Sequence, residues 1–282
     1  MIKYLDPGMN SEDYIFKHIL DQPYVIIITH SPETMTNWKV FVDKTRLLFN
    51  SKKFTDAGIV VEAGLEKYPN QARLLTLASD VYRASDNREK SLDYAELLIT
   101  HHEEKWIGYG RAAQDLIVLK RVEQAQEKIK LGLEKCPNQL NLLTIISDIY
   151  HASQDHKKSL EYAELLITHH EEKWIGYGRA AQDLIVLKRV EEAQEKIKLG
   201  LEKFPNQVNL LSIASDVYRA SNDREKSLEC AELLITHQPE NWNRYVRAAE
   251  DLIALARFKD LEIFCSTIVD NSIKKDLEIS FA

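Results

Sequence analysis

Apolar residues recur along most of the chain at intervals of three and four positions, which is the spacing of a helix face rather than of a strand. One such face consists of Leu74, Leu75, Ala78, Val81 and Tyr82. A second apolar set follows at 92–98, and the polar link Ser-Asp-Asn at 85–87 supplies an N-cap for that second helix. The pattern therefore predicts a hairpin of two helices, with Asn70 after Pro69 as the expected cap of the first helix.

The hairpin pattern repeats with a period of 34, and pairs of hairpins repeat with a period of 68. All four tryptophans follow the longer period, and the sequence Pro-Asn-Gln begins at 69, 137 and 205. The segments 72–139 and 140–207 are identical at about four positions in five. A fixed period of this length is typical of a solenoid of copied units. The predicted units are 38–71, 72–105, 106–139, 140–173, 174–207, 208–241 and 242–275.

A 34-residue helical hairpin that ends in proline resembles the tetratricopeptide repeat (TPR) family. The small residues at which that family packs helix against helix, and the closing prolines, are matched by Ala113, Ala125, Gly132, Pro137, Ala181, Ala193, Gly200 and Pro205. The alternate units depart from this pattern and should pack differently, because they carry Ser79, Ser91, Ser147, Ser159, Ser215 and Ser227. The resemblance covers 38–275 and implies an all-α fold, a right-handed α-solenoid of TPR-like antiparallel helical hairpins.

The two ends of the chain are less regular than the repeats. Residues 1–37 are expected to form an N-terminal cap, and the similarity of 28–33 to 235–240 favours a degenerate repeat. The alternative is a strand, because residues 24–29 are β-prone. Residues 276–282 are expected to be a C-terminal tail.

Composition narrows the class of protein. The 282 residues include only 9 Gly and 7 Pro, so turns must be few. The net charge of -7 argues against nucleic-acid binding, which needs a basic surface. The longest strongly apolar run, 24–29, is too short to span a membrane, and the first residues lack the apolar stretch of a secretory signal. With three cysteines and no CxxC spacing, we expect a cytoplasmic protein without disulfides or membrane insertion.

The residue types most often used for chemistry are better explained by packing or by surface position. Cys136, Cys230 and Cys265 occupy positions that are apolar in the other repeats, so they are expected to be buried. The sequence His-His-Glu-Glu at 101–104 and 169–172 falls at the predicted joint between hairpins, where adjacent histidines diverge. No nucleotide-binding, hydrolase or zinc-protease motif is present. We therefore expect no enzyme, no catalytic residue, no cofactor and no metal.

A tryptophan-containing motif, Trp-x-x-Tyr-x-Arg-Ala-Ala-x-Asp, occurs at 106–115, 174–183 and 242–251. Its tryptophans are expected to pack between the helical layers. Its arginine and aspartate, Arg111 and Asp115 in the first copy, are spaced i, i+4, which suits an ion pair within one helix.

The family resemblance implies that the first helix of each hairpin lines a concave groove. On that register the candidate partner-binding residues are Asp80, Arg111, Gln114, Asp148, Arg179, Gln182, Asp216, Arg247 and Glu250. In one interpretation neighbouring hairpins neutralise one another through a ladder of these aspartates and arginines. In the other, the same groups bind a polar or charged peptide. Gly110 and Gly178 lie beside two of the arginines, where the missing side chains are either simply tolerated or open shallow pockets.

The function implied by the resemblance is a non-catalytic protein–protein interaction scaffold that binds a peptide or a helix in this groove. One alternative is an accessory or regulatory arm of an enzyme assembly, such as a surface-glycan or sulfo-transfer system. The other is a self-assembling structural rod, because near-identical units can stack end to end.

Overall fold

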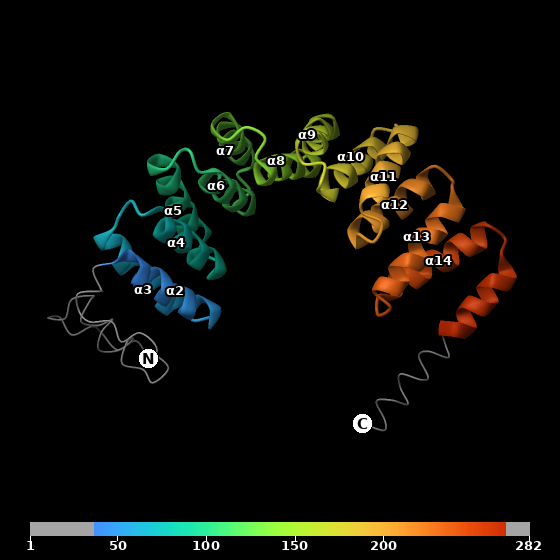
Figure 1. The fold of residues 1–282 in the computed structure, drawn as a ribbon, viewed down its shortest axis with the longest axis horizontal. Helices are drawn as coiled ribbons and strands as arrows, with labels where there is room; N and C mark the ends of the chain where they lie inside the picture. Colours follow the sequence, from blue (N-terminus) through green and yellow to red (C-terminus); the bar gives the residue numbers. More distant parts are fainter. Residues whose placement is uncertain (1–36, 269–282) are drawn as a thin grey trace, which may run out of the picture. The chain divides into compact units, whose positions relative to one another are not determined.

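A computed structural model of the chain describes residues 37–268, which form helices joined by short turns (Figure 1). The first helices of the successive hairpins are α2 (Trp38–Asn50), α4 (Ala72–Ala84), α6 (Trp106–Val118), α8 (Leu140–Ala152), α10 (Trp174–Val186), α12 (Val208–Ala220) and α14 (Trp242–Ala254). The second helices are α3 (Phe54–Lys67), α5 (Arg88–His101), α7 (Val122–Lys135), α9 (His156–His169), α11 (Val190–Lys203) and α13 (Arg224–His237). Residues 258–268 are also helical.

The all-α prediction is confirmed for this range, in which no residue is in a strand. The expectations for the N-terminal cap at 1–37 and for the tail at 276–282 concern residues that, apart from residue 37, lie outside the described part. No helix of the described part combines the length and the apolar character needed to cross a bilayer.

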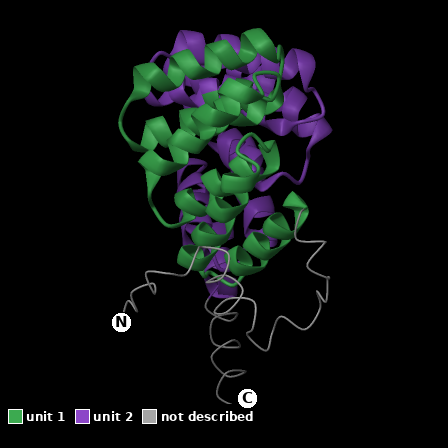
Figure 2. Cartoon of the chain, turned by 90° about the vertical axis from the view of Figure 1, so that its left-hand side faces the viewer, with its two compact units in different colours: residues 1–145 green, residues 146–282 purple. Residues whose placement is uncertain are grey.

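The chain divides into two compact units, residues 1–145 and 146–282, with the division inside α8 (Figure 2). In the first unit α2 packs on α3, α4 on α5 and α6 on α7, while α4 also contacts both α2 and α6. In the second unit α10 packs on α9 and α11, α12 packs on α13, and α10 contacts α12. In both units, therefore, first helices of neighbouring hairpins contact one another: α2 with α4 and α4 with α6 in the first unit, and α10 with α12 in the second.

Each hairpin turn uses one residue in the left-handed region of backbone conformation. These residues have φ between 54° and 62° and are Lys52, Asp86, Lys120, Gln154, Lys188, Asn222 and Ala256, spaced by 34. Backbone hydrogen bonds from Asp86 and Asn87 to the last turn of α4 close the helix end, as a left-handed residue at this position allows. The Asn87 side chain then caps α5, as predicted. The cap of α4 is Gln71 rather than Asn70, because Gln71 directly precedes the helix.

The small residues shared with the TPR pattern bring paired helices into close contact. Ala113 and Ala125 are fully buried. A Cβ atom added to Gly132 of α7 would lie 2.7 Å from the Cβ of Tyr109 in α6, so only glycine fits at this helix approach. The corresponding Cβ on Gly200 would lie 2.9 Å from the Cβ of Tyr177.

The serines of the alternate units form buried pairs between the two helices of a hairpin, so these units do pack differently. The Oγ atoms of Ser79 in α4 and Ser91 in α5 are 3.0 Å apart, and both residues are fully buried. The pairs Ser147–Ser159 and Ser215–Ser227 repeat the contact at 3.3 Å and 3.1 Å. A hydrogen bond thus replaces the alanine contact of the other units, which satisfies polar groups that burial would otherwise leave without partners.

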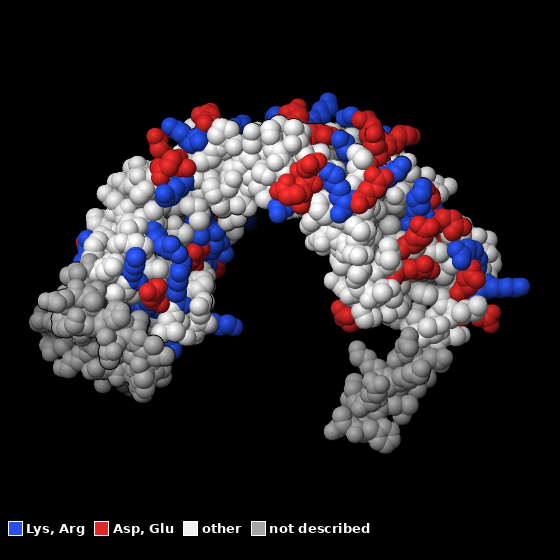
Figure 3. Space-filling view, in the orientation of Figure 1, with Lys and Arg blue, Asp and Glu red and all other residues white. Residues whose placement is uncertain are grey.

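Charged side chains of both signs lie interspersed over the visible surface of each unit (Figure 3). One acidic residue in each tryptophan-containing motif is buried instead: Asp115, Asp183 and Asp251 have no exposed surface. A buried carboxylate is stable only when cations and hydrogen-bond donors surround it.

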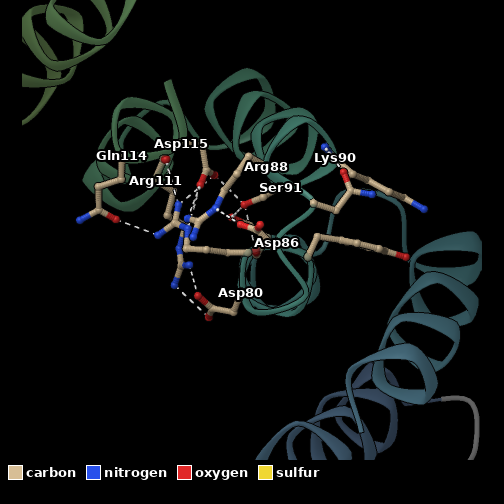
Figure 4. Close-up of polar contacts among 12 residues, drawn as sticks. Asp80, Asp86, Arg88, Lys90, Ser91, Arg111, Gln114 and Asp115 are labelled. Atoms are coloured by element: carbon tan, nitrogen blue, oxygen red, sulfur yellow. Dashed lines mark hydrogen bonds and ion pairs between the residues drawn. The ribbon is translucent and has the colours of Figure 1, made fainter. Parts of the chain in front are cut away.

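Asp115 of α6 receives its donors from the preceding hairpin (Figure 4). Arg83 binds both carboxylate oxygens, at 3.0 Å and 2.9 Å, and the hydroxyl of Ser91 donates to Oδ2 at 2.6 Å. Arg88 adds a longer contact of 3.4 Å to Oδ1. The expected ion pair between Arg111 and Asp115 within one helix is therefore wrong, because Asp115 points into the interface between hairpins and is already surrounded there.

The same arrangement is built around Asp251 of α14. Arg219 and Arg224 lie 3.1 Å and 3.0 Å from its Oδ1, and Ser227 donates to Oδ2 at 2.6 Å. The buried carboxylate therefore joins a serine-containing hairpin to the tryptophan-containing hairpin that follows it, which accounts for a repeat of two hairpins rather than one. In the hairpin at 38–71 the position of Asp115 is taken by Leu47, which is 52% exposed.

The glycine contacts give a first prediction. Gly132→Ala should lower the free energy of unfolding by about 1–3 kcal/mol, because the new methyl group collides with Tyr109. Gly110→Ala is the matched control: its Cβ would meet other atoms at 3.5 Å or more, so the gain in helix propensity should raise stability by up to about 1 kcal/mol. Urea titrations followed by circular dichroism measure both, and the same sign for both variants would contradict this packing.

The buried carboxylate gives a second prediction. Asp115→Ala should cost about 2–4 kcal/mol of unfolding free energy, because it leaves two arginines at an interface without their common partner. Asp80→Ala, which removes a half-exposed carboxylate from the same interface, should cost less than about 1 kcal/mol. Amide hydrogen exchange locates the effect, and protection should fall in α4, α5 and α6 of the Asp115 variant. Equal costs for the two variants would refute the role given to Asp115.

Candidate functional site

The arginines expected to line the groove each pair with an aspartate of the preceding hairpin. Arg111 of α6 binds both carboxylate oxygens of Asp80 in α4, as Figure 4 shows. Arg179 binds Asp148 of the preceding hairpin through one of its oxygens. Arg247 lies 2.6 Å from Asp216. The contacts are three separate pairs, each linking a serine-containing hairpin to the next one.

Of the three remaining candidate residues, two take part in contacts between hairpins and one is bonded within its own helix. Gln114 accepts a hydrogen bond of 2.7 Å from Arg83, and Glu250 accepts one of 2.7 Å from Arg219. Gln182 accepts one of 3.2 Å from Arg179 of its own helix. All nine candidates thus lie at or beside the contacts between first helices, and each already has a partner within the chain.

The first unit contains a hollow of about 570 Å³ lined by first helices and by Lys105, which precedes α6. Phe49 of α2 and Leu77 of α4 supply apolar wall, and Asp80 also lines it. Arg46 and Arg73 are the other charged lining residues, and both are exposed. Neither arginine side chain has an ion-pair partner among residues 37–268.

The second unit has a smaller hollow, of about 360 Å³, between α10 and α12. Arg179, Gln182 and Asp216 line it together with the indole of Trp174. Its other lining residues are Ile175, Asn209, Ser212 and Ile213. First helices therefore supply the walls here as well.

An isoleucine of the next first helix lies close to each of the groove glycines. A Cβ on Gly178 would lie 2.9 Å from Cδ1 of Ile213, and one on Gly110 would lie 3.5 Å from Cδ1 of Ile145. Ile213 and Trp174, the side chains nearest to Gly178, also line the hollow of the second unit together with Arg179. The missing side chain at Gly178 thus lets Ile213 approach, whereas Gly110 leaves room for a Cβ atom.

The tryptophans of the repeated motif were expected to pack between the helical layers, and this prediction is wrong for Trp242. Trp106 and Trp174 are half-buried, but Trp242 is 64% exposed. The reason is local: Trp106 and Trp174 pack beside a glycine that the isoleucine of the next hairpin also contacts, whereas the last copy has Val246 in place of that glycine.

The three cysteines differ in how far their side chains are buried. Cys230 is buried as expected, and burial raises the pKa of its thiol to about 12. Cys136 is half-buried, with its Sγ 3.2 Å from the carbonyl oxygen of Glu104. Cys265 is exposed, which corrects the expectation. Its counterparts Ile129 and Ile197 are both fully buried.

One histidine at the joint between hairpins contacts the backbone of the preceding hairpin. His102 places Nε2 2.7 Å from the carbonyl oxygen of Asn70, one hairpin earlier. Next to it, hydrogen bonds from the backbone of Glu104 and from Lys105 lower the pKa of the Glu104 carboxyl. These contacts agree with the structural role that the sequence favoured for this segment.

Two residues, one exposed and one buried, escaped the sequence analysis. Arg46 occupies the position of Gln114 in the hairpin at 38–71, so comparison of the repeats could have found it. The buried position of Asp115 could be found only in three dimensions, because its partners come from the preceding hairpin.

Comparisons with known proteins identify the fold. No family model matches the sequence, and no curated protein matches it. Among solved structures, the C-terminal part of a TPR repeat-containing protein from Cytophaga hutchinsonii has a TM-score of 0.63 at 13% identity, over 82% of this chain and 93% of that one. A tetratricopeptide repeat protein from Parabacteroides merdae has a TM-score of 0.61 at 14% identity, over 87% and 99%.

A third structure is YrrB, described as a TPR protein with an unusual peptide-binding site. Its TM-score is 0.51 at 16% identity, over 71% of this chain and 97% of that one. At these identities the likeness concerns the fold, and it agrees with the 34-residue hairpins described above. The chain has the tetratricopeptide-repeat fold.

Proposed function

We propose that the chain is a non-catalytic protein-interaction scaffold whose first-helix surface binds an extended peptide, and that the hollow of the first unit receives an acidic side chain of that peptide. The observation that carries this proposal is the pair of exposed arginines, Arg46 and Arg73, in the wall of that hollow. The proposal also draws on YrrB, which has the same fold and is described as having a peptide-binding site.

The charge balance of the hollow favours an acidic ligand. The negative charge of Asp80 is offset by Arg111, which binds both of its oxygens. Arg46 and Arg73 therefore contribute positive charge that no described residue neutralises. A guanidinium group binds a carboxylate through two parallel hydrogen bonds, which gives direction as well as affinity.

The walls of the same hollow suit the apolar part of a peptide. Phe49 and Leu77 offer apolar surface, and the hydroxyl of Thr76 is already bonded to the carbonyl oxygen of Ala72 in its own helix. A volume of about 570 Å³ has room for a few side chains but not for a folded domain. An extended segment with an acidic residue beside an apolar one fits these walls.

The hollow of the second unit suits an uncharged polar segment. Arg179 and Asp216 are each paired with another residue, Asp148 and Arg247 respectively, so their charges cancel within the chain. The amide of Asn209 supplies both donors and acceptors at this wall.

A charge-reversal experiment tests the acidic specificity. An array of synthetic twelve-residue peptides that vary in charge is incubated with the intact chain and with the Arg46→Glu/Arg73→Glu variant. The intact chain should select acidic peptides, and the variant should bind the same peptides at least about tenfold more weakly, because like charges replace opposite ones. Raising the salt concentration should weaken the binding of the intact chain.

Lys157→Glu/Lys198→Glu is the matched control, because it makes the same change in net charge at exposed positions on the second helices α9 and α11. This control should keep the affinity of the intact chain. A similar loss in both variants would mean that only net charge matters, and an intact chain without preference for acidic peptides would overturn the proposal.

A further inference from the structure

The buried aspartates differ in what surrounds them. Asp115 and Asp251 each lie against two arginines of the preceding hairpin. In the middle copy the corresponding residues are His151 and His156, and the buried carboxylate is that of Asp183. Within residues 37–268 this is the one place where three side chains from histidine, cysteine, aspartate or glutamate gather closely enough to hold a metal ion.

The three side chains converge from three helices. His151 lies in the last turn of α8, His156 begins α9, and Asp183 belongs to α10. The two Nδ1 atoms lie 2.6 Å and 2.8 Å from the same oxygen, Oδ1 of Asp183. The two imidazole rings stand edge to face with their centres 5.0 Å apart, and all three ligand atoms lie within 4.8 Å of one another.

The second carboxylate oxygen of Asp183 has no hydrogen-bond partner, although the residue is fully buried. At Asp115 the corresponding oxygen receives the hydroxyl of Ser91 at 2.6 Å. In the middle copy Ser159 donates to the carbonyl oxygen of Ser147 instead. A buried carboxylate oxygen without a donor is unfavourable, so a cation that contacts both oxygens of Asp183 would stabilise this carboxylate more fully than the two imidazoles do.

The charge balance points to a divalent cation. At Asp115 and Asp251, two guanidinium groups bring two positive charges beside one buried carboxylate. The two imidazoles carry no permanent charge, and a buried charge is rarely left without a counter-ion. One divalent cation bound by the two imidazoles restores the charge that the two arginines supply in the other copies.

We propose that His151, His156 and Asp183 bind a divalent transition-metal ion, with Zn²⁺ as the best fit. Imidazole nitrogen together with carboxylate oxygen is a common donor set for zinc, whereas Mg²⁺ and Ca²⁺ prefer oxygen ligands alone. Zinc bonds of about 2.0–2.2 Å in tetrahedral geometry place ligand atoms about 3.3 Å apart, so each imidazole moves away from Oδ1 by roughly half an ångström. The partial exposure of both histidines provides access for the ion and a water molecule as fourth ligand.

The ion would act as a cross-link between hairpins. Its ligands come from both helices of the hairpin at 140–173 and from the first helix of the next hairpin. The arginines make the same connection in the other two copies, so the metal takes over a structural contact and no chemistry is required of it. This inference departs from the expectation, drawn from the sequence, that the chain has no metal site, and it is independent of the peptide-binding proposal.

The test uses the full chain, stripped with a chelator and titrated with Zn²⁺ against a chromophoric competitor at about pH 7.5, where imidazole nitrogens are free to bind metal. The intact chain should bind one tight equivalent, and its melting temperature should rise on binding. Mg²⁺ should cause no rise. In the intact chain, the imidazole NMR signals of His151 and His156 should shift as Zn²⁺ is added, which identifies the ligands without any substitution.

The matched control is His151→Arg/His156→Arg, which installs the residues that the chain itself uses at the two other copies. This variant should fold, as judged by circular dichroism, and should bind Zn²⁺ at least about a hundredfold more weakly, without a rise in melting temperature. Equal zinc affinity in both proteins would assign the metal to other histidines and refute the site. An intact chain that binds no Zn²⁺, or whose His151 and His156 signals do not move, would refute it as well.

Discussion

A carboxylate that is buried away from water must be surrounded by donors, and this requirement organises the contact between neighbouring hairpins. Asp115 and Asp251 each hold two arginines and one serine of the preceding hairpin. Those serines are in turn bonded to a serine of the opposite helix, so one network joins three helices. The two kinds of hairpin are therefore complementary rather than equivalent, which explains why the repeating unit of the chain is a pair of hairpins.

The same requirement decides which polar groups remain for a partner. Arginines at the interface of hairpins are committed to Asp80, Asp148 and Asp216, and Gln114 is committed to Arg83. A partner that met only these groups would have to break contacts that hold the array together. Arg46 and Arg73, in the wall of the first hollow, have no ion-pair partner among the described residues. The proposed specificity for acidic peptides follows from these two arginines.

Because the 68-residue units are near copies of one another, a residue that differs in only one copy shows what that residue changes. When a position has the same surroundings in three copies, a change in one copy alters the chemistry while the scaffold stays the same. Exchanging two arginines for His151 and His156 keeps the buried aspartate but replaces permanent cations by groups that can bind a metal ion. The arginine-containing copies then serve as built-in controls for the middle one.

The sequence by itself determined the helices, their hairpin pairing and the period of 34, because these depend on residues close together in the chain: apolar faces, small residues at helix contacts, and caps such as Asn87. The sequence also indicated that the serine-containing hairpins pack differently from the tryptophan-containing ones. Only the tertiary structure decided which partner each charged residue takes. Arg111 and Asp115 are one turn apart in a helix, yet each binds a residue of the preceding hairpin, because burial turns Asp115 toward that hairpin. Burial of a repeated position is decided in the same way, by what packs on it from other parts of the chain: Ile129 and Ile197 are buried, whereas Cys265 at the matching position is exposed.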